Sequence, residues 1–292
     1  EITCRDWSSD VCSSDLLLEA EAEQTAGQVI SRQRILSLPV CPFDIAKSVG
    51  IEVASRDSDT PGVSGFLMRV GNEFGIYYAT HIRNDGFIRF SVAHELGHYF
   101  LAGHPEALFP NGDGLHKSRS GFISANSHER QADFFAASLL MPEDLFRQVM
   151  GDAGSGFAAI ERLKETCNTS ITATAIRYAK FTDDPVAVIV SSKGYVNWCF
   201  LSNALSEVPG VRRLAKGSPL PSGSCTAQFN RVAGNVSGGA KDAAWASLDD
   251  WFDDAPQIEM KEDVIGLGGY GKTLTVLFTE EAIEYDEGED DD

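Results

Sequence analysis

The most informative part of the sequence is Arg89-Phe-Ser-Val-Ala-His-Glu-Leu-Gly-His-Tyr-Phe-Leu101. Its two histidines, His94 and His98, are four positions apart, so on a helix they leave the same face one turn apart and reach one zinc ion. Glu95 is placed to contact a water at that metal. Apolar residues at three- and four-residue spacing predict the helix. Gly97 costs a mid-helix position about 1 kcal/mol, so we expect another element to pack closely there.

A second helix is predicted from His128 to Pro142. Glu129 and Asp133 lie one turn apart on one face of it, among small and apolar residues. The Glu129 carboxylate is suited to be the third zinc ligand, and Asp133 to accept a hydrogen bond from the outer nitrogen of a ligand histidine. His128 is the competing third ligand. Pro142, followed by two acids, marks the start of a further helix.

These two stretches together resemble the ImmA/IrrE family of zinc metallopeptidases. The resemblance covers residues 17–142, including Pro42-Phe-Asp-Ile near the start of that range. Its specific parts are Arg89 through His98 and Glu129-x-x-Ala132-Asp133-x-Phe135-Ala136-Ala137-x-Leu139-Leu140-Met141-Pro142.

The resemblance implies an α+β, zincin-like fold of the gluzincin type, with a small β-sheet beside the metal helix. It also implies Zn²⁺ as the cofactor, with ligands His94, His98 and Glu129, and Glu95 as the general base. Gln131 departs from the family, because many relatives have a second glutamate there. We expect the metal site to be kept, since Glu129 matches the ligand position.

The function that the resemblance implies is a cytoplasmic endopeptidase that cleaves a transcriptional repressor of the helix-turn-helix type, in a stress response or in a mobile element. The alternative is a non-catalytic zinc-containing regulatory protein that docks on a repressor or on DNA. A peptidase also needs a donor for the developing oxyanion. The candidates are Tyr78, His81, His104, His116 and His128.

Charge and cysteine usage narrow the class of protein. The formal charge is −19, of which residues 1–16 contribute −3 and the acidic tail at 280–292 contributes −9. The remaining −7 argues against broad DNA binding, which needs a basic face. Residues 1–16 resemble the translation of a sequencing adapter, so we treat them as non-native. The four cysteines outside residues 1–16 show no Cys-x-x-Cys spacing, so neither a zinc knuckle nor a disulfide framework is indicated. No apolar run is long enough for a membrane span. We expect a cytoplasmic protein.

The remaining elements of the first domain follow from breakers and short apolar runs. Helices are expected at 17–36 and 42–50, and short strands at 51–53, 63–70 and 74–78. A breaker-rich loop is expected at 102–127, and a loop of that length is more often functional than idle. We interpret it as a mobile flap beside the metal site.

The C-terminal half divides into two further parts. Two short helices around an Asn-Thr-Ser turn resemble a helix-turn-helix, but Arg177 and Lys180 supply little positive charge for phosphate contacts, so we favour a packing role. Strand-like runs at 185–190, 195–201, 224–229 and 273–278 predict an α+β domain. Gly266 to Gly271 is expected to form a hairpin turn and not a phosphate loop, since a strand follows it. The predicted divisions are 1–16 non-native, 17–156 peptidase-like, 157–182 helix-turn-helix-like, 183–279 α+β and 280–292 acidic tail.

Overall fold

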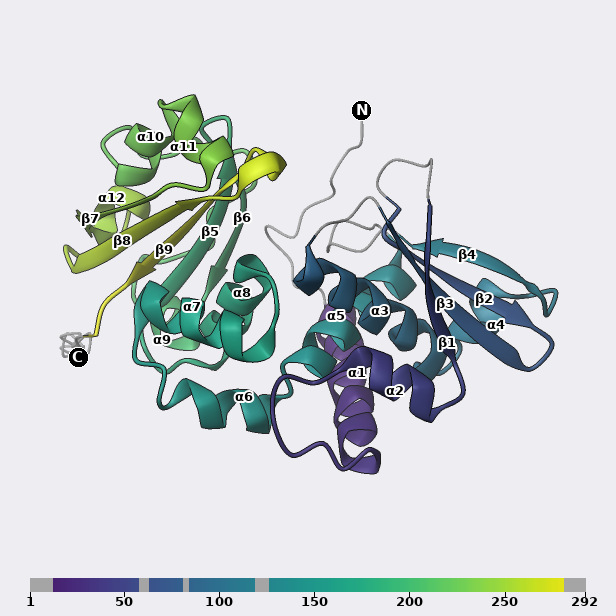
Figure 1. Cartoon of the computed structure of the whole chain (residues 1–292). Helices are drawn as coiled ribbons and strands as arrows, with labels where there is room; N and C mark the ends of the chain where they lie inside the picture. The colour runs from purple at the N-terminus through teal and green to yellow at the C-terminus, as the bar shows by residue number, and fades with distance from the viewer. Residues whose placement is uncertain (1–12, 58–62, 81–83, 119–125, 281–292) are drawn as a thin grey trace. The chain divides into compact units, whose positions relative to one another are not determined.

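The computed structural model describes residues 13–57, 63–80, 84–118 and 126–280 of the chain (Figure 1). These residues form two compact units, one of residues 13–152 with 162–173, and one of residues 153–161 with 174–280. Each unit has its own sheet and its own helices, which confirms the α+β class. Among the described residues, no helix combines the length and the apolar character that crossing a membrane requires.

The first unit is built on a four-stranded sheet in the order β1-β3-β2-β4. β1 (Glu52–Arg56) runs parallel to β3 (Glu73–Ala79), whereas β2 (Gly65–Val70) is antiparallel to both β3 and β4 (Gly114–Ser118). β1 to β3 correspond to the three expected strands.

The helices of the first unit pack around one long buried helix. α3 (Asp85–Phe100) contacts β2, β3 and α5 (Ser127–Leu140), and α5 also packs along α1 (Ser13–Arg32). The side chains of Leu67, Ile76, Leu96 and Phe135 have no exposed surface, so the core lies between the sheet and these helices. α2 (Pro42–Ser48) begins with proline at its first turn, as expected.

Two expectations for the first unit were wrong. The expected N-terminal helix ends at Arg32 and not at Leu36, because Arg34 takes a positive φ of 53° that ends the helical path; its first residue is Ser13 and not Leu17. The expected loop at 102–127 contains α4 (His104–Leu108) and β4. β4 has no apolar alternation of its own, and its strand conformation comes from pairing with β2. The part of the expected flap at 119–125 lies outside the described residues.

The second unit contains a five-stranded antiparallel sheet in the order β6-β5-β9-β8-β7. β5 (Val186–Ser192), β6 (Tyr195–Leu201) and β9 (Thr273–Phe278) were expected from the sequence. β7 (Lys241–Ser247) and β8 (Glu259–Gly266) were not, because charged residues interrupt their apolar pattern. The glycine-rich segment after β8 forms the expected hairpin turn, with a short 3-10 helix, η1 (Gly268–Tyr270).

Residues 224–229, expected as a strand, instead begin the helix α10 (Cys225–Asn230). The Ser224 hydroxyl accepts a hydrogen bond from the backbone N–H of Ala227 at 3.1 Å. The buried Glu262 carboxylate accepts those of Cys225 and Thr226, at 3.1 and 2.6 Å. Satisfying the free N–H groups at a helix start stabilises the helix, and here one of the acceptors comes from a distant strand.

The remaining helices are mostly short. They are α6 (Glu143–Met150), α7 (Gly156–Cys167), α8 (Ile171–Phe181), α9 (Asn203–Ser206), α11 (Ala233–Gly238) and α12 (Leu248–Trp251). α7 and α8 are the two helices of the expected helix-turn-helix. Arg177 is only 5% exposed and lies over the Phe181 ring, so it is not presented for phosphate contacts.

α5 packs closely against α3 at Gly97, as its mid-helix position predicts. A Cβ atom there would lie 3.1 Å from Cδ1 of Phe135 and 3.2 Å from Cα of Ala132. The second of these neighbours is backbone, which a rotamer change cannot move. The glycine therefore sets the distance between the two helices.

We expect Gly97→Ala to destabilise the protein by about 1–3 kcal/mol, because the added methyl overpacks this contact. Gly27→Ala is the matched control, since Gly27 lies in α1 with open space around it. The control should stabilise by about 0.5–1 kcal/mol through helix propensity. Thermal unfolding of both variants measures the difference, and equal shifts in the two would contradict the packing argument.

Candidate metal centre

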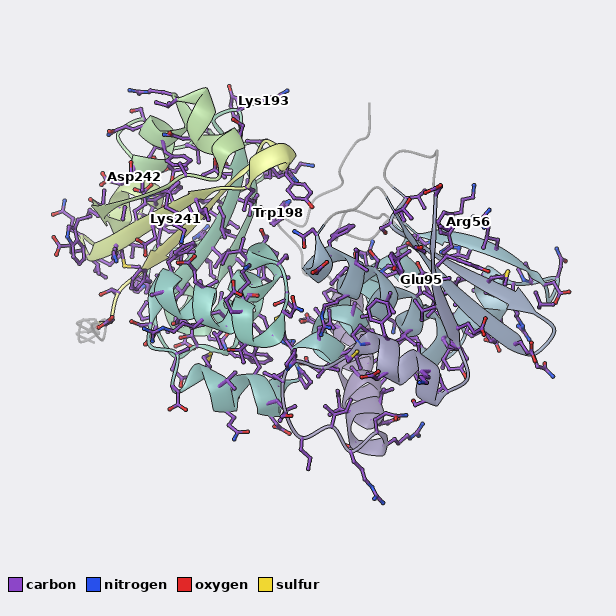
Figure 2. The ribbon with its side chains drawn as sticks, in the orientation of Figure 1. Arg56, Glu95, Lys193, Trp198, Lys241 and Asp242 are labelled. Atoms are coloured by element: carbon purple, nitrogen blue, oxygen red, sulfur yellow. The ribbon has the colours of Figure 1, made fainter. Side chains whose placement is uncertain are left out.

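His94, Glu95 and His98 lie on α3 and have no exposed surface. α3 begins where the Asn84 side chain accepts a hydrogen bond from the backbone N–H of Phe87 at 3.0 Å. In Figure 2, the labelled Glu95 lies inside the first unit. The helix that the sequence predicts therefore turns these three side chains inward, towards α5 and the sheet.

α5 brings Glu129 to the two histidines. Nε2 of His98 lies 3.2 Å from Oε1 of Glu129, Nε2 of His94 lies 3.5 Å from Oε2, and the two Nε2 atoms are 3.1 Å apart. The candidate ligand atoms of these three residues all lie within 4.8 Å of one another. His128, the competing third ligand, does not belong to this group; its ring packs against that of His104.

The donor set fits zinc. Two imidazole nitrogens and one carboxylate are the ligands of many catalytic zinc sites, which keep a further position for water. Asp133, one turn beyond Glu129, accepts a hydrogen bond from Nδ1 of His94 at 2.7 Å. An outer carboxylate of this kind fixes the orientation of a ligand histidine and raises its basicity.

Glu95 is a buried carboxyl group without an ordinary partner. Neither of its oxygens makes a hydrogen bond of regular geometry within the described residues. Burial raises its pKa to about 7, against the opposing effects of His94, the nearby Ser118 hydroxyl and His116. A carboxyl group with that pKa exchanges protons at neutral pH, as a general base must.

Gly65, on β2, makes room for this carboxyl group. A Cβ atom at Gly65 would lie 2.4 Å from Oε1 of Glu95. Sequence analysis did not find this residue, because a glycine at the start of an expected strand carries no signal of its own. Because Gly65 has no side chain, β2 leaves space for the Glu95 carboxyl group.

The histidines are divided between charged and neutral forms. Burial alone would lower the pKa of His94, but Asp133, Glu129 and Glu95 outweigh burial and raise it to about 10. For His98, burial prevails and lowers the pKa to about 3. The pKa of Glu129 is lowered, since hydrogen bonds from His116 and His94 outweigh its burial. A metal ion at Nε2 of His94 therefore competes with a proton.

Two further histidines surround the site. On β4, Nε2 of His116 lies 2.9 Å from Oε1 of Glu129, and the His116 side chain is 19% exposed. His104, at the start of α4, is buried with its Nδ1 3.0 Å from Nδ1 of His98. Of the other oxyanion candidates, Tyr78 packs edge-on against Phe43, and His81 lies outside the described residues.

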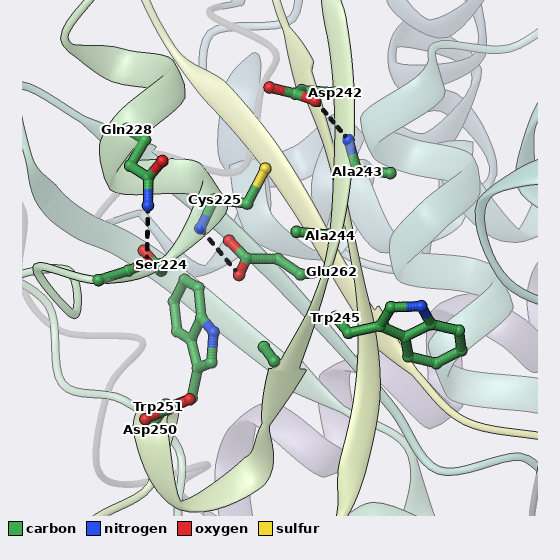
Figure 3. Close-up of a pocket in the computed structure, with 12 residues that line it drawn as sticks. Ser224, Cys225, Gln228, Asp242, Ala243, Ala244, Trp245, Asp250, Trp251 and Glu262 are labelled. Atoms are coloured by element: carbon green, nitrogen blue, oxygen red, sulfur yellow. Dashed lines mark hydrogen bonds between the residues drawn. The ribbon is translucent and has the colours of Figure 1, made fainter.

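The second unit has a pocket of about 360 Å³ beside β7 (Figure 3). Glu262 at its base is satisfied by the start of α10, and Trp245 is directed away from Trp251. Burial, with Asp242 and Glu262 nearby, raises the pKa of the Cys225 thiol to about 11. That thiol stays protonated at neutral pH and is a poor nucleophile.

Comparison with known proteins relates part of the chain to a family. Residues 46–178 match the family model described as the IrrE N-terminal-like domain, Peptidase_M78. This stretch is an IrrE N-terminal-like domain. The match confirms the resemblance to the ImmA/IrrE family and the zincin-like fold of this domain. It contains His94, Glu95, His98 and Glu129.

One solved structure with a similar fold is described as a Mycobacterium tuberculosis transcriptional regulator. The TM-score is 0.54 at 12% sequence identity, and the match covers 89% of this chain and 76% of that chain. At this identity the likeness concerns the fold alone. Comparison with curated proteins gives no match.

The burial of neutral His98 predicts that acid destabilises the metal-free protein. Its pKa is about 3 in the folded chain and near 6.5 when unfolded, so below pH 6.5 the unfolded chain binds a proton that the folded chain does not. The contribution of His98 to stability therefore falls as the pH drops from 6.5 towards 3, by at most about 1.4 kcal/mol per pH unit. His94 and Glu95 act in the opposite direction, because the folded chain holds their protons up to about pH 10 and pH 7, whereas His104, with a pKa of about 4, adds to the effect of His98.

Urea unfolding of the chelator-treated protein at pH 7 and pH 5 measures this effect. The slope with pH should be shallower in His98→Gln, which removes the titrating group. Identical slopes in the wild type and the variant would refute the assignment to His98.

Proposed function

We propose that the protein is a zinc-dependent endopeptidase. The observation that carries the proposal is the convergence of His94, His98 and Glu129 around one point, beside the buried carboxyl group of Glu95. The IrrE N-terminal-like domain supports a metallopeptidase-like or regulatory role for residues 46–178. His94, His98 and Glu129 are the proposed ligands, Asp133 orients His94, and Glu95 is the general base.

Each residue of the site has a defined task in this proposal. Zinc, when bound, supplies Lewis acidity towards the scissile carbonyl and towards water. Glu95, with a pKa of about 7, takes a proton from the attacking water and passes it to the leaving amine. His116 is our preferred oxyanion donor, since it lies at the ligand carboxylate and its side chain reaches solvent.

The proposed substrate is a transcriptional repressor of the helix-turn-helix type, and the proposed location is the cytoplasm. Both rest on the resemblance to the ImmA/IrrE family. Direct DNA binding is disfavoured by the mild negative charge of the folded part and by the burial of Arg177. The alternative, a non-catalytic regulator that docks on the repressor, would use the same domain without the chemistry of Glu95.

We expect Glu95→Gln to retain zinc and to lose cleavage by a factor of about 100 or more, because the general base is removed while the ligands stay. Zinc content is measured by elemental analysis, and cleavage by intact-mass spectrometry of a purified helix-turn-helix repressor incubated with the protein. Glu73→Gln, an exposed position on β3, makes the same charge change away from the site and should leave both unchanged.

Cleavage by Glu95→Gln at the wild-type rate would exclude the proposed role of Glu95. If repressor function in the cell responds equally to the wild type and to this variant, the docking regulator becomes the better explanation. If the wild type binds no zinc, the three-ligand site itself is refuted.

We expect Gly65→Ala to reduce cleavage more than zinc binding, because the new methyl would occupy the place of Oε1 of Glu95. Gly27→Ala serves as the control for a methyl added in open space. Zinc content and cleavage are again measured by elemental analysis and intact-mass spectrometry. An equal loss of zinc and cleavage would indicate general disruption of the site.

A further inference from the structure

A string of polar side chains leads from His98 to the surface of the first unit. Nδ1 of His98 lies 3.0 Å from Nδ1 of His104, and Nε2 of His104 lies 3.0 Å from Oε1 of Gln131. Nε2 of Gln131 donates to Oε2 of Glu21 at 3.0 Å. His98, His104 and Gln131 are buried, with 0, 1 and 7% exposure, whereas Glu21 is exposed. Four helices, α3, α4, α5 and α1, each contribute one member.

The donor and acceptor roles along this series of hydrogen bonds follow from the carboxylate of Glu21 at its exposed end. A carboxylate only accepts hydrogen bonds, so the amide of Gln131 must turn its NH₂ group to Glu21 and its oxygen to His104. An amide oxygen also only accepts, so Nε2 of His104 must carry a hydrogen. In a neutral imidazole the other nitrogen is then an acceptor.

The same reasoning fixes His98. Since Nδ1 of His104 accepts, Nδ1 of His98 must carry the hydrogen that it donates. Nε2 of the neutral His98 then carries a lone pair and no hydrogen. This is the nitrogen that lies 3.2 Å from Glu129 and 3.1 Å from Nε2 of His94, at the proposed metal position.

We propose that Gln131 and Glu21, acting through His104, are positioning residues that hold His98 in the tautomer whose Nε2 binds the metal. The inference rests on the metal site of the proposed function. The two ligand histidines are thus oriented by different means. Asp133 bonds directly to Nδ1 of His94, whereas Nδ1 of His98 is reached through a neutral relay that begins outside the matched residues 46–178, at Glu21.

The local structure around His104 keeps the relay in place. Gly103, with a φ of 82°, precedes α4, which starts at His104 and has Pro105 in its first turn. The backbone N–H of His104 donates to the carbonyl of Leu101 at 3.3 Å. A positive φ at Gly103 is a conformation that glycine adopts without strain, so the chain turns there and carries the imidazole back to His98.

The test compares substitutions at Gln131 in the full-length chain. Gln131→Met keeps the approximate volume and removes both polar functions, so the relay is broken. Gln131→Glu keeps an acceptor for Nε2 of His104. Either carboxylate oxygen can accept, so the direction of the relay no longer depends on Glu21, which repels the new carboxylate instead of orienting an amide. Glu73→Gln, exposed on β3, is the control for a remote change of charge.

Two readouts are used, neither of which is catalytic activity. Zinc affinity is measured by competition with a chromophoric chelator, and the tautomer of His98 is measured by ¹⁵N NMR of the metal-free protein. We expect Gln131→Met to raise the zinc Kd by about 10–100-fold, the usual effect of losing an outer partner of a ligand. Its His98 should also lose the pure Nδ1–H form, whereas Gln131→Glu and Glu73→Gln should keep that form and near wild-type affinity.

The outcomes separate this inference from the proposed function. An unchanged zinc Kd in Gln131→Met, or an Nε2–H tautomer of His98 in the metal-free wild type, overturns the relay while the metal site stands. If the wild type binds no zinc, the metal site fails, and the NMR comparison of the wild type with Gln131→Met still decides whether the relay sets the tautomer.

Discussion

The close contact between α3 and α5 at Gly97 brings together the side chains of the candidate metal centre. α3 carries His94, Glu95 and His98, and α5 carries Glu129, Gln131 and Asp133. Because Gly97 has no side chain, the backbone of Ala132 comes within contact distance of α3. A wider separation would take the carboxylates of α5 out of hydrogen-bonding range of the histidines.

Bringing these helices together buries several ionisable groups at once, which is costly unless each has a partner. Asp133 and Glu129 face His94, and the neutral His98 is matched to the neutral His104 and Gln131. Glu95 is the exception, since its oxygens have no regular hydrogen bond within the described residues. Unsatisfied buried polar groups are rare in folded proteins and gather at functional sites, where a substrate or water completes them.

The second unit also buries a glutamate, but there the carboxylate has a structural role. Glu262 is fully buried, and its oxygens accept hydrogen bonds from the backbone of Cys225 and Thr226 and from the Thr226 hydroxyl. The hydrogen-bonding capacity of this carboxylate is therefore used to stabilise the start of α10. This contrast with Glu95 explains why one buried glutamate is a candidate for chemistry and the other is not.

Features that depend on neighbours along the chain could be predicted from the sequence. The four-residue spacing of His94 and His98, the position of Glu95 between them and the helical pattern around Glu129 all follow from the 3.6-residue period, and they suffice to indicate the family. Tertiary structure decided which distant groups meet. The pairing of β4 with β2, the room that Gly65 leaves for Glu95 and the path from His98 through His104 and Gln131 to Glu21 join segments far apart in the chain. No local period specifies such contacts, because they depend on how the helices and the sheet pack, so only the folded chain reveals them.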